Sequence, residues 1–345
     1  MSAPSPSSGQ PDESRQTVPG GWEALEGMDR VTPSLLIGMF GKEATALQRK
    51  LREDQTCRIH VFDVAAESDT VIAEVDDILL EAPNWSVDGS TLYLNGLGVL
   101  WAVPLDAPST RRRIDFLDLP AINNDHVLDP AGNGIYLSAM DGHIYRGSLD
   151  GGAVRRVTGE DDIWHFLHGI SPDGATLGFI RIAVDGTPSR LAVIPAGGGA
   201  VTLVETGDGA TDGFEFSPDG EWIYFNTERW AAAPGHAQLA RVPADRPTAG
   251  SVERLISTDT VDWFPHLSPD GRLAVYLEFP EGTVGHPEDE EVHVVVVATS
   301  DWSRPLARIA AFGGQGTINV NSWSPDSTRF AFVSYPDTAH SEPIG

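Results

Sequence analysis

The sequence predicts an all-β fold, a six-bladed β-propeller closed by pairing N-terminal strands with the C-terminal blade. Three observations lead to this prediction. A turn of the Ser-Pro-Asp-Gly kind recurs six times at the spacing of propeller blades. Each copy is followed by a strand rich in aromatic and β-branched residues. The sixth copy lies too near the C-terminus to build a whole blade, so the missing strands must come from elsewhere in the chain.

The repeated unit is an apolar stretch, a turn and a second apolar strand. Its copies read NWSVDGSTLYLN, HVLDPAGNGIYLS, HGISPDGATLGFI, FEFSPDGEWIYFN, PHLSPDGRLAVYL and NSWSPDSTRFAFV. The first turn residues lie 43, 42, 46, 51 and 56 positions apart, and they are Ser86, Asp129, Ser171, Ser217, Ser268 and Ser324. A blade of four antiparallel strands takes about 40 to 50 residues. The turn has a physical basis, because Pro fixes φ, Asp bonds to the local backbone and Gly accepts positive φ.

Ring closure follows from the two ends of the repeat. The last copy leaves two strands for its blade, and the segments IHVFDV and VIAEV before the first copy can supply the other two. Such pairing removes the exposed edges that an open array would carry. The propeller is expected over residues 57–338, with blades at about 81–121, 123–158, 164–206, 211–257, 261–310, and 317–335 plus 57–75.

The first 56 residues are expected to precede the propeller. Residues 1–30 contain few apolar side chains, so burial cannot offset the entropy of ordering them, and we expect a disordered tail. Residues 31–56 form an N-terminal extension, in which 35–53 are compatible with either a short helix or an extra strand.

Composition limits the partners of the protein. With 23 Lys and Arg against 50 Asp and Glu, the formal net charge is −27, which repels nucleic acid and anionic membranes. Cys57 is the single cysteine, which excludes an intrachain disulfide and a cysteine-based zinc site. The start of the chain has no secretory signal pattern, so we expect a cytoplasmic protein.

Polar residues gather at one predicted mouth of the channel. In a blade, the loop leading into the first strand and the loop between the second and third strands share one face, opposite the repeated turns. These positions hold Glu81, Asn84, Asp125, His126, His165, His168, Asp212, Glu215, Glu228, Arg229, Gln238, Asp262, His266, His286, Gln315 and Asn319. Random placement would have divided them between both faces.

Longer stretches of the chain resemble the TolB-like propellers over roughly residues 57–335, and in particular a bacterial subgroup labelled Tol biopolymer transport component. The matching stretches are LLEAPNW at 79–85, NNDH at 123–126, DWFPHLSPDG at 262–271, GHP at 285–287 and GGQGTINVNSWSPDS at 313–327. In fold and turn motif the chain is also distantly similar to oligogalacturonate lyase, a cytoplasmic propeller that cleaves sugar chains by β-elimination around manganese held by histidines and a glutamine. The second blade departs from the pattern with Asp-Pro-Ala-Gly at 129–132.

The histidines at the mouth suggest a metal site. Neutral imidazole and carboxamide oxygen are common ligands of divalent metals, and the lyase resemblance implies manganese. The predicted ligands are His168, His266, His286 and Gln315, and at least three histidines of the mouth should surround one ion or line one pocket. The alternative for each histidine is a hydrogen bond to a neighbouring blade.

Two classes of function remain open. The first is a metal-dependent lyase or isomerase acting on a sugar acid, an oligosaccharide or another polyhydroxylated small molecule. Its base would be His126 or His168, and Arg229 would clamp a carboxylate. The substrate-binding residues would be Glu81, Asn84, Asp125, Asp212, Glu215 and Asn319. The second is a noncatalytic scaffold that binds a protein or peptide on the same face, but a mouth rich in polar residues favours the enzyme.

Overall fold

The computed structural model describes residues 49–183, 187–231 and 233–340. The chain divides into two units, 1–31 and 32–345, and every described residue belongs to the second. The expected tail and most of the expected helix or extra strand at 35–53 lie outside the described residues. Residues 49–56 form neither element, and Gln55 makes one isolated bridge to Asp337. Among the described residues, no helix has the length and apolarity needed to cross a membrane.

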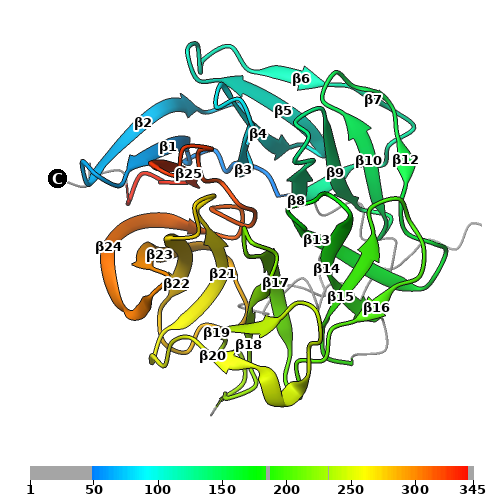
Figure 1. Ribbon diagram of the computed structural model, residues 1–345. Coiled ribbons are helices and arrows are strands. Elements are labelled where there is room, and N and C mark those ends of the chain that lie inside the picture. Colours follow the sequence, from blue (N-terminus) through cyan, green and yellow to red (C-terminus); the bar gives the residue numbers. More distant parts are fainter. Residues whose placement is uncertain (1–48, 184–186, 232, 341–345) are drawn as a thin grey trace, which may run out of the picture. The chain divides into compact units, whose positions relative to one another are not determined.

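The described residues form a six-bladed β-propeller, as predicted (Figure 1). Five blades are antiparallel sheets of four strands, and β3, β8, β13, β17 and β21 are the strands nearest the centre. Blade one consists of β3 (Glu81–Trp85), β4 (Thr91–Gly96), β5 (Val99–Pro104) and β6 (Arg112–Ile114). Blade two consists of β8 (Ile122–Leu128), β9 (Gly134–Ala139), β10 (Ile144–Ser148) and β12 (Arg155–Arg156). The short strands β7 (Phe116–Leu117) and β11 (Gly152–Ala153) pair in parallel beside these two blades.

The next three blades repeat the same meander. Blade three consists of β13 (Ile163–Ile170), β14 (Thr176–Ala183), β15 (Arg190–Pro195) and β16 (Thr202–Leu203). Blade four consists of β17 (Thr211–Phe216), β18 (Trp222–Thr227), β19 (Gln238–Pro243) and β20 (Glu253–Arg254), with the 3-10 helix η2 (Ala249–Ser251) before its last strand. Blade five consists of β21 (Val261–Leu267), β22 (Leu273–Phe279), β23 (Glu288–Ala298) and β24 (Asp301–Gly314).

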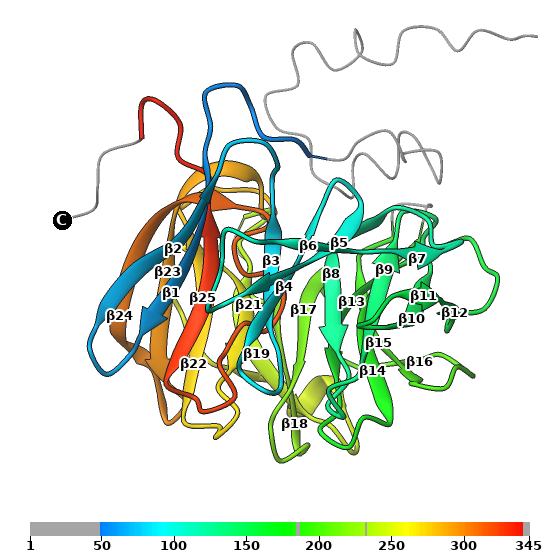
Figure 2. The same cartoon turned by 90° about the horizontal axis from the view of Figure 1, so that it is seen from above.

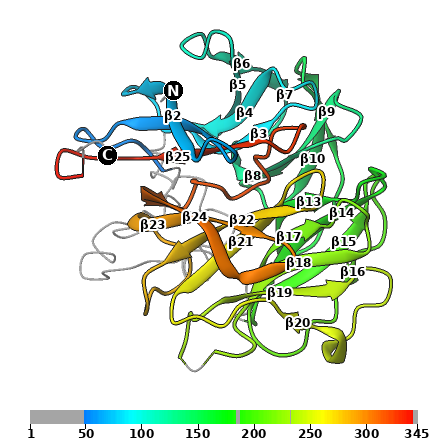
Figure 3. The ribbon, with the colours of Figure 1, turned by 60° about the vertical axis from the view of Figure 1, so that its left-hand side comes forward.

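The sixth blade joins the two ends of the propeller, which confirms the predicted closure. It contains β1 (Cys57–Asp63), β2 (Ser68–Val75) and β25 (Arg329–Ser334). The middle strand β1 pairs antiparallel with both neighbours, from Cys57↔Val75 on one side and Arg58↔Ser334 on the other. In Figures 2 and 3 the blue N-terminal strands and the red β25 lie side by side.

The position of the innermost strand in blade six is irregular. The sequence predicts two regular strands from 317 to 335, but before β25 the structure has a single bridge, Trp323↔Phe330. Residues 315–322 are here called the central segment. The segment bonds to β25 through two main-chain contacts, Ala331 N–H to the Ser322 carbonyl and Val333 N–H to the Thr317 carbonyl, and several of its other polar groups contact other blades. Six of these eight residues are buried.

The repeated turns are built as their residues predict. In blade one the Ser86 hydroxyl donates to Asp88 over 2.6 Å, and the main-chain N–H of Gly89 donates to the Ser86 carbonyl over 2.9 Å. Gly89 has a φ of +78°, which glycine adopts readily. Where blade two has Asp129 in place of Ser, its carboxylate is fixed by Arg146 at 2.8 Å. The residues of the repeated turns therefore stabilise the turns themselves, and the predicted site residues lie on the opposite face.

Candidate functional site

Most of the predicted site residues lie on the first strands and on the central segment, while His286 and Arg229 lie in loops. The contacts among these residues form two groups. One group, here called the mouth cluster, consists of Asp125, His168, Asp212, His286, Gln315 and Asn319. The other, the inner cluster, consists of Asn84, His126, Glu215, His266 and Asn321. Glu81 belongs to neither group and contacts Arg49.

His168 is the centre of the mouth cluster. Its Nε2 lies 3.3 Å from Asp212 Oδ1 and 3.8 Å from Asp125 Oδ1. Its Nδ1 donates to the main-chain carbonyl of Asn319 over 3.2 Å, which fixes the orientation of the ring. The ring also stacks against Phe264, with 5.7 Å between the centroids. This imidazole is therefore held between two carboxylates.

His286 extends the mouth cluster from the loop before β23. Its Nε2 lies 3.8 Å from Asp212 Oδ2, and its Nδ1 bonds to Gln315 Oε1. The same Gln315 oxygen accepts a hydrogen bond from Asn319 over 3.2 Å. Trp263 meets the imidazole edge-on, with 4.5 Å between the centroids. Asp212 is thus shared by two histidines from different blades.

Burial and charge set the protonation of this cluster. Burial raises the pKa of Asp125 to about 7, and nearby Asp212 adds to the rise while His168 opposes it. Burial lowers the pKa of His168, but Asp125 and Asp212 outweigh this effect and raise it to about 9. For Asp212, burial raises the pKa but the hydrogen bond and charge of His168 outweigh it, so the pKa falls. At neutral pH the cluster holds an imidazolium against an ionised Asp212.

Stability is expected to fall as pH rises, because the folded-state pKa of His168 lies above its ordinary value. The contribution of His168 is complete below pH 6.5 and is lost as pH rises through about 9. Asp125, with its pKa raised from 3.8 to about 7, acts in the same direction over a lower range. His168→Asn should reduce the fall between about pH 6 and pH 9 by about 2 kcal/mol. Urea unfolding at both pH values measures this, with the exposed His293→Asn as control, and an equally steep fall in His168→Asn would contradict it.

The inner cluster joins blades through buried hydrogen bonds. His126 Nδ1 bonds to Asn84 Oδ1 over 2.9 Å, and Asn84 donates to the Asn321 carbonyl over 2.8 Å. His266 Nδ1 lies 3.1 Å from Glu215 Oε2, and its Nε2 donates to the Ile318 carbonyl over 2.7 Å. These contacts link four blades with the central segment.

His126 is the most enclosed of the predicted catalytic residues. It has no exposed surface, and burial lowers its pKa to about 3. Its Nε2 is buried without a hydrogen-bond partner among the described residues. The other predicted catalytic residue outside the mouth cluster, Arg229, donates to the Thr206 carbonyl over 2.6 Å and supports a loop.

The structure does not bring all four predicted metal ligands together. His168, His286 and Gln315 come together, but His266 lies in the inner cluster with both ring nitrogens bonded. Within residues 49–183, 187–231 and 233–340, no group of three or more His, Cys, Asp or Glu is arranged to hold a metal ion. The predicted four-ligand set therefore does not fit a metal centre as it stands.

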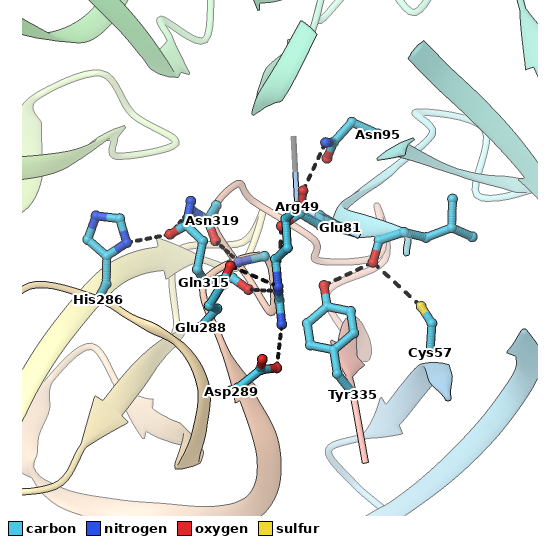
Figure 4. A network of polar contacts seen from close by, with 12 residues as sticks. Arg49, Cys57, Glu81, Asn95, His286, Glu288, Asp289, Gln315, Asn319 and Tyr335 are labelled. Carbon is cyan, nitrogen blue, oxygen red and sulfur yellow. Dashed lines mark hydrogen bonds and ion pairs between the residues drawn. The ribbon is translucent and has the colours of Figure 1, made fainter. Parts of the chain in front are cut away.

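Arg49 is a residue of the mouth that the sequence interpretation missed. Its guanidinium donates to the Gln315 carbonyl over 2.7 Å and to Asp289 Oδ1 over 2.9 Å (Figure 4). It also lies 3.1 Å from Glu288 and 3.6 Å from Glu81. The only signal in the sequence was its charge, because a basic residue next to an acidic mouth is favoured electrostatically.

Comparison with known proteins identifies the family. No family model matches the chain. A curated relative, an uncharacterized protein of Agrobacterium fabrum, is 34% identical over 281 residues, which are 80% of this chain and 92% of the relative. The solved structure of a candidate TolB from Agrobacterium tumefaciens is 32% identical, with a TM-score of 0.74, and covers 82% of this chain and 99% of that chain. The chain belongs to the TolB-like propeller family.

More distant structures share only the fold with this TolB-like propeller. TolB from Acinetobacter baumannii is 18% identical with a TM-score of 0.54, covering 77% of this chain and 66% of that one. Oligogalacturonate lyase from Vibrio parahaemolyticus is 12% identical with a TM-score of 0.50, covering 80% and 77%. The TolB-like resemblance drawn from the sequence is therefore confirmed at the level of family, and the similarity to oligogalacturonate lyase at the level of fold alone.

Proposed function

We propose that this TolB-like propeller is a noncatalytic scaffold whose channel mouth binds a cationic side chain of a protein or peptide partner. The observation that carries the proposal is the convergence of Glu81, Glu288 and Asp289 on one guanidinium at the mouth. Carboxylates placed together attract cations and repel acidic sugars. The net charge of −27 acts in the same direction.

The state of the mouth cluster also supports a scaffold. His168 and His286 are bonded to acceptors within the cluster, and only small parts of Asp212 and His286 reach solvent, with side chains 18% and 13% exposed. Two open recesses, of about 530 and 470 Å³, occur at the edge of blades six and one and beside Trp222. Neither is lined by a residue of the mouth cluster.

The second candidate is lyase or isomerase chemistry on a sugar acid or another polyhydroxylated small molecule. One observation favours it, because Asp125 and His168 lie 3.8 Å apart with pKa values raised to about 7 and about 9. Groups that exchange protons near neutral pH have such values. His168 would be the proton-transfer residue, since His126 is fully enclosed.

The scaffold proposal is tested by titrating the full chain with short arginine-containing peptides and measuring binding by isothermal titration calorimetry. We expect saturable binding that weakens with salt, and a loss of about tenfold in affinity for Glu288→Gln/Asp289→Asn. Glu281→Gln, an exposed carboxylate in the loop before β23, is the matched control and should bind as the wild type does. The proposal fails if no such peptide binds. Turnover of oligogalacturonate to a conjugated product by the same protein would establish the second candidate instead.

Metal content separates the two candidates independently. Protein purified without a metal-affinity tag is expected to contain no stoichiometric manganese, because His266 is committed to Glu215 and Ile318. Elemental analysis measures this directly. One metal ion per chain that disappears in both His168→Ala and His286→Ala would contradict the expectation and favour the enzyme.

A further inference from the structure

We infer that Arg49 occupies, within the same chain, the site that receives an arginine side chain of the partner, so that the partner binds by displacing it. This inference rests on the proposed function and adds the recognised group and its regulation. It concerns a site built from β3, β23, the central segment and Tyr335, the residue after β25.

The contacts of Arg49 are those by which proteins recognise a guanidinium. Asp289 Oδ1 and the Gln315 carbonyl accept hydrogen bonds from the guanidinium, at 2.9 and 2.7 Å, and Glu288 forms an ion pair with its Nε at 3.1 Å. The flat face lies on the Tyr335 ring, 4.1 Å from its centroid. In-plane acceptors combined with an aromatic face favour arginine over lysine, whose ammonium has no plane to match.

The inner part of the site, at Arg49 and Glu81, is buried and cannot stand empty without a cost, whereas the Glu288 side chain is 55% exposed. The Arg49 side chain is 9% exposed and the Glu81 side chain 10%. Burial raises the pKa of Glu81, and the charge of Arg49 opposes that rise. A buried carboxylate that loses its cation is strongly destabilised. A guanidinium from another chain would restore the same contacts, so exchange is favoured over simple opening.

Two further features shape the site around the guanidinium. Asn95 donates to Glu81 over 3.1 Å, while its Oδ1 is buried and has no partner among the described residues, leaving an acceptor beside the carboxylate. Gly316 has a φ of +90°, and a Cβ there would lie 2.6 Å from Glu81 Oε1 and 2.7 Å from the Tyr335 hydroxyl. Glycine therefore lets Glu81 and Tyr335 pack directly against the main chain at this position.

The segment that carries Arg49 can leave without disrupting the sheets. Residues 49–56 form no strand or helix, and β1 begins at Cys57. The segment is held mainly by side chains, since Arg52 bonds to Asp289 and Asp337, and Gln55 bonds to Asp289 over 2.7 Å. The Asp289 carboxylate thus accepts hydrogen bonds from three side chains of one short segment, those of Arg49, Arg52 and Gln55. Displacement would release these bonds and leave the pairing of β1 intact.

Displacement of Arg49 would also change the contacts of a residue of the mouth cluster. Gln315 accepts from Arg49 through its main-chain carbonyl and bonds to His286 through its side chain (Figure 4). The mouth cluster and the guanidinium site therefore share one residue. A partner that replaces Arg49 contacts a group already linked to His286 and Asp212.

The experiment compares the full-length wild type with Arg49→Ala. We expect Arg49→Ala to melt at a lower temperature and ethylguanidinium to restore the melting temperature saturably, whereas ethylammonium at the same concentration does not. The wild type should gain nothing from either compound. A short arginine-containing peptide should bind Arg49→Ala at least about tenfold more tightly than the wild type, because it no longer competes with an internal side chain. Arg58→Ala, which removes an ion pair on β1, is the control and should show neither effect.

The outcomes separate this inference from the proposed function. If wild type and Arg49→Ala bind the peptide equally, displacement is wrong and the scaffold stands. If neither binds, the scaffold proposal fails as well. If ethylguanidinium restores the melting temperature of Arg49→Ala but the peptide binds this variant no more tightly than the wild type, Arg49 only stabilises the propeller. That result would overturn the inference. Should Arg49→Ala not fold, Arg49→Lys keeps the charge, removes the planar fork and decides the question by the same peptide titration.

Discussion

A chain that begins after Val75 is expected to lose cooperative folding. Strand β1 lies in the middle of its sheet, so the deletion removes two strands and leaves β25 without a partner. It also removes Ile59, Val61 and Phe62 from the core between blades. Without β1, the edge of β25 is unpaired and exposes both apolar surface and backbone hydrogen-bonding groups. Thermal and urea unfolding, followed by circular dichroism and tryptophan fluorescence, measure the loss.

A shorter deletion is the matched control for ring closure. Removal of residues 1–20, which contain few apolar side chains, should leave the melting temperature almost unchanged. A cooperative melt of the longer deletion close to that of the full chain would show that the ring does not need its N-terminal strands.

His266→Ala is expected to destabilise the protein by about 3 to 5 kcal/mol. The side chain is 1% exposed and both ring nitrogens are bonded. Truncation removes the donor to the Ile318 carbonyl and the contact of Glu215 Oε2, and it opens a cavity beside them. Unfolding in urea gives the free energy. His293→Ala, whose side chain is 46% exposed, should stay within about 0.5 kcal/mol of the wild type.

An unchanged free energy for His266→Ala would be equally informative. It would mean that the inner cluster contributes little to stability, and that His266 is free to serve a ligand as the sequence suggested. Peptide binding measured on the same variant would then show whether the channel mouth depends on this residue.

The fold was predictable because its signals are local. Each turn carries its own chemistry, as the bond between Ser86 and Asp88 shows, and the repeat of that chemistry gives both the number of blades and their order. Ring closure followed from counting strands at the two ends. The regular meander also placed His168 and Asp212 at the same mouth before any contact between them was known.

The contacts at the mouth were not predictable, because they join residues far apart in sequence. His266 and Glu215 are 51 positions apart, and His168 and Asn319 are 151 apart. A pattern fixes the face on which a side chain lies, but the partner of each ring nitrogen depends on packing between blades. Arg49 lies outside every repeat, so no periodicity could assign it a place.

The central segment has a mechanical consequence. Ile318, Asn319 and Asn321 each give a main-chain carbonyl to a different blade, and the Asn321 side chain bonds to a further one. Blades in a ring otherwise contact only their two neighbours, so their small motions can remain independent. Here the central segment forms hydrogen bonds with blades one, three, four and five, so these blades are linked through the same eight residues. A displacement of Gln315 at the mouth is therefore expected to shift the positions of several blades and not only that of the adjacent sheet.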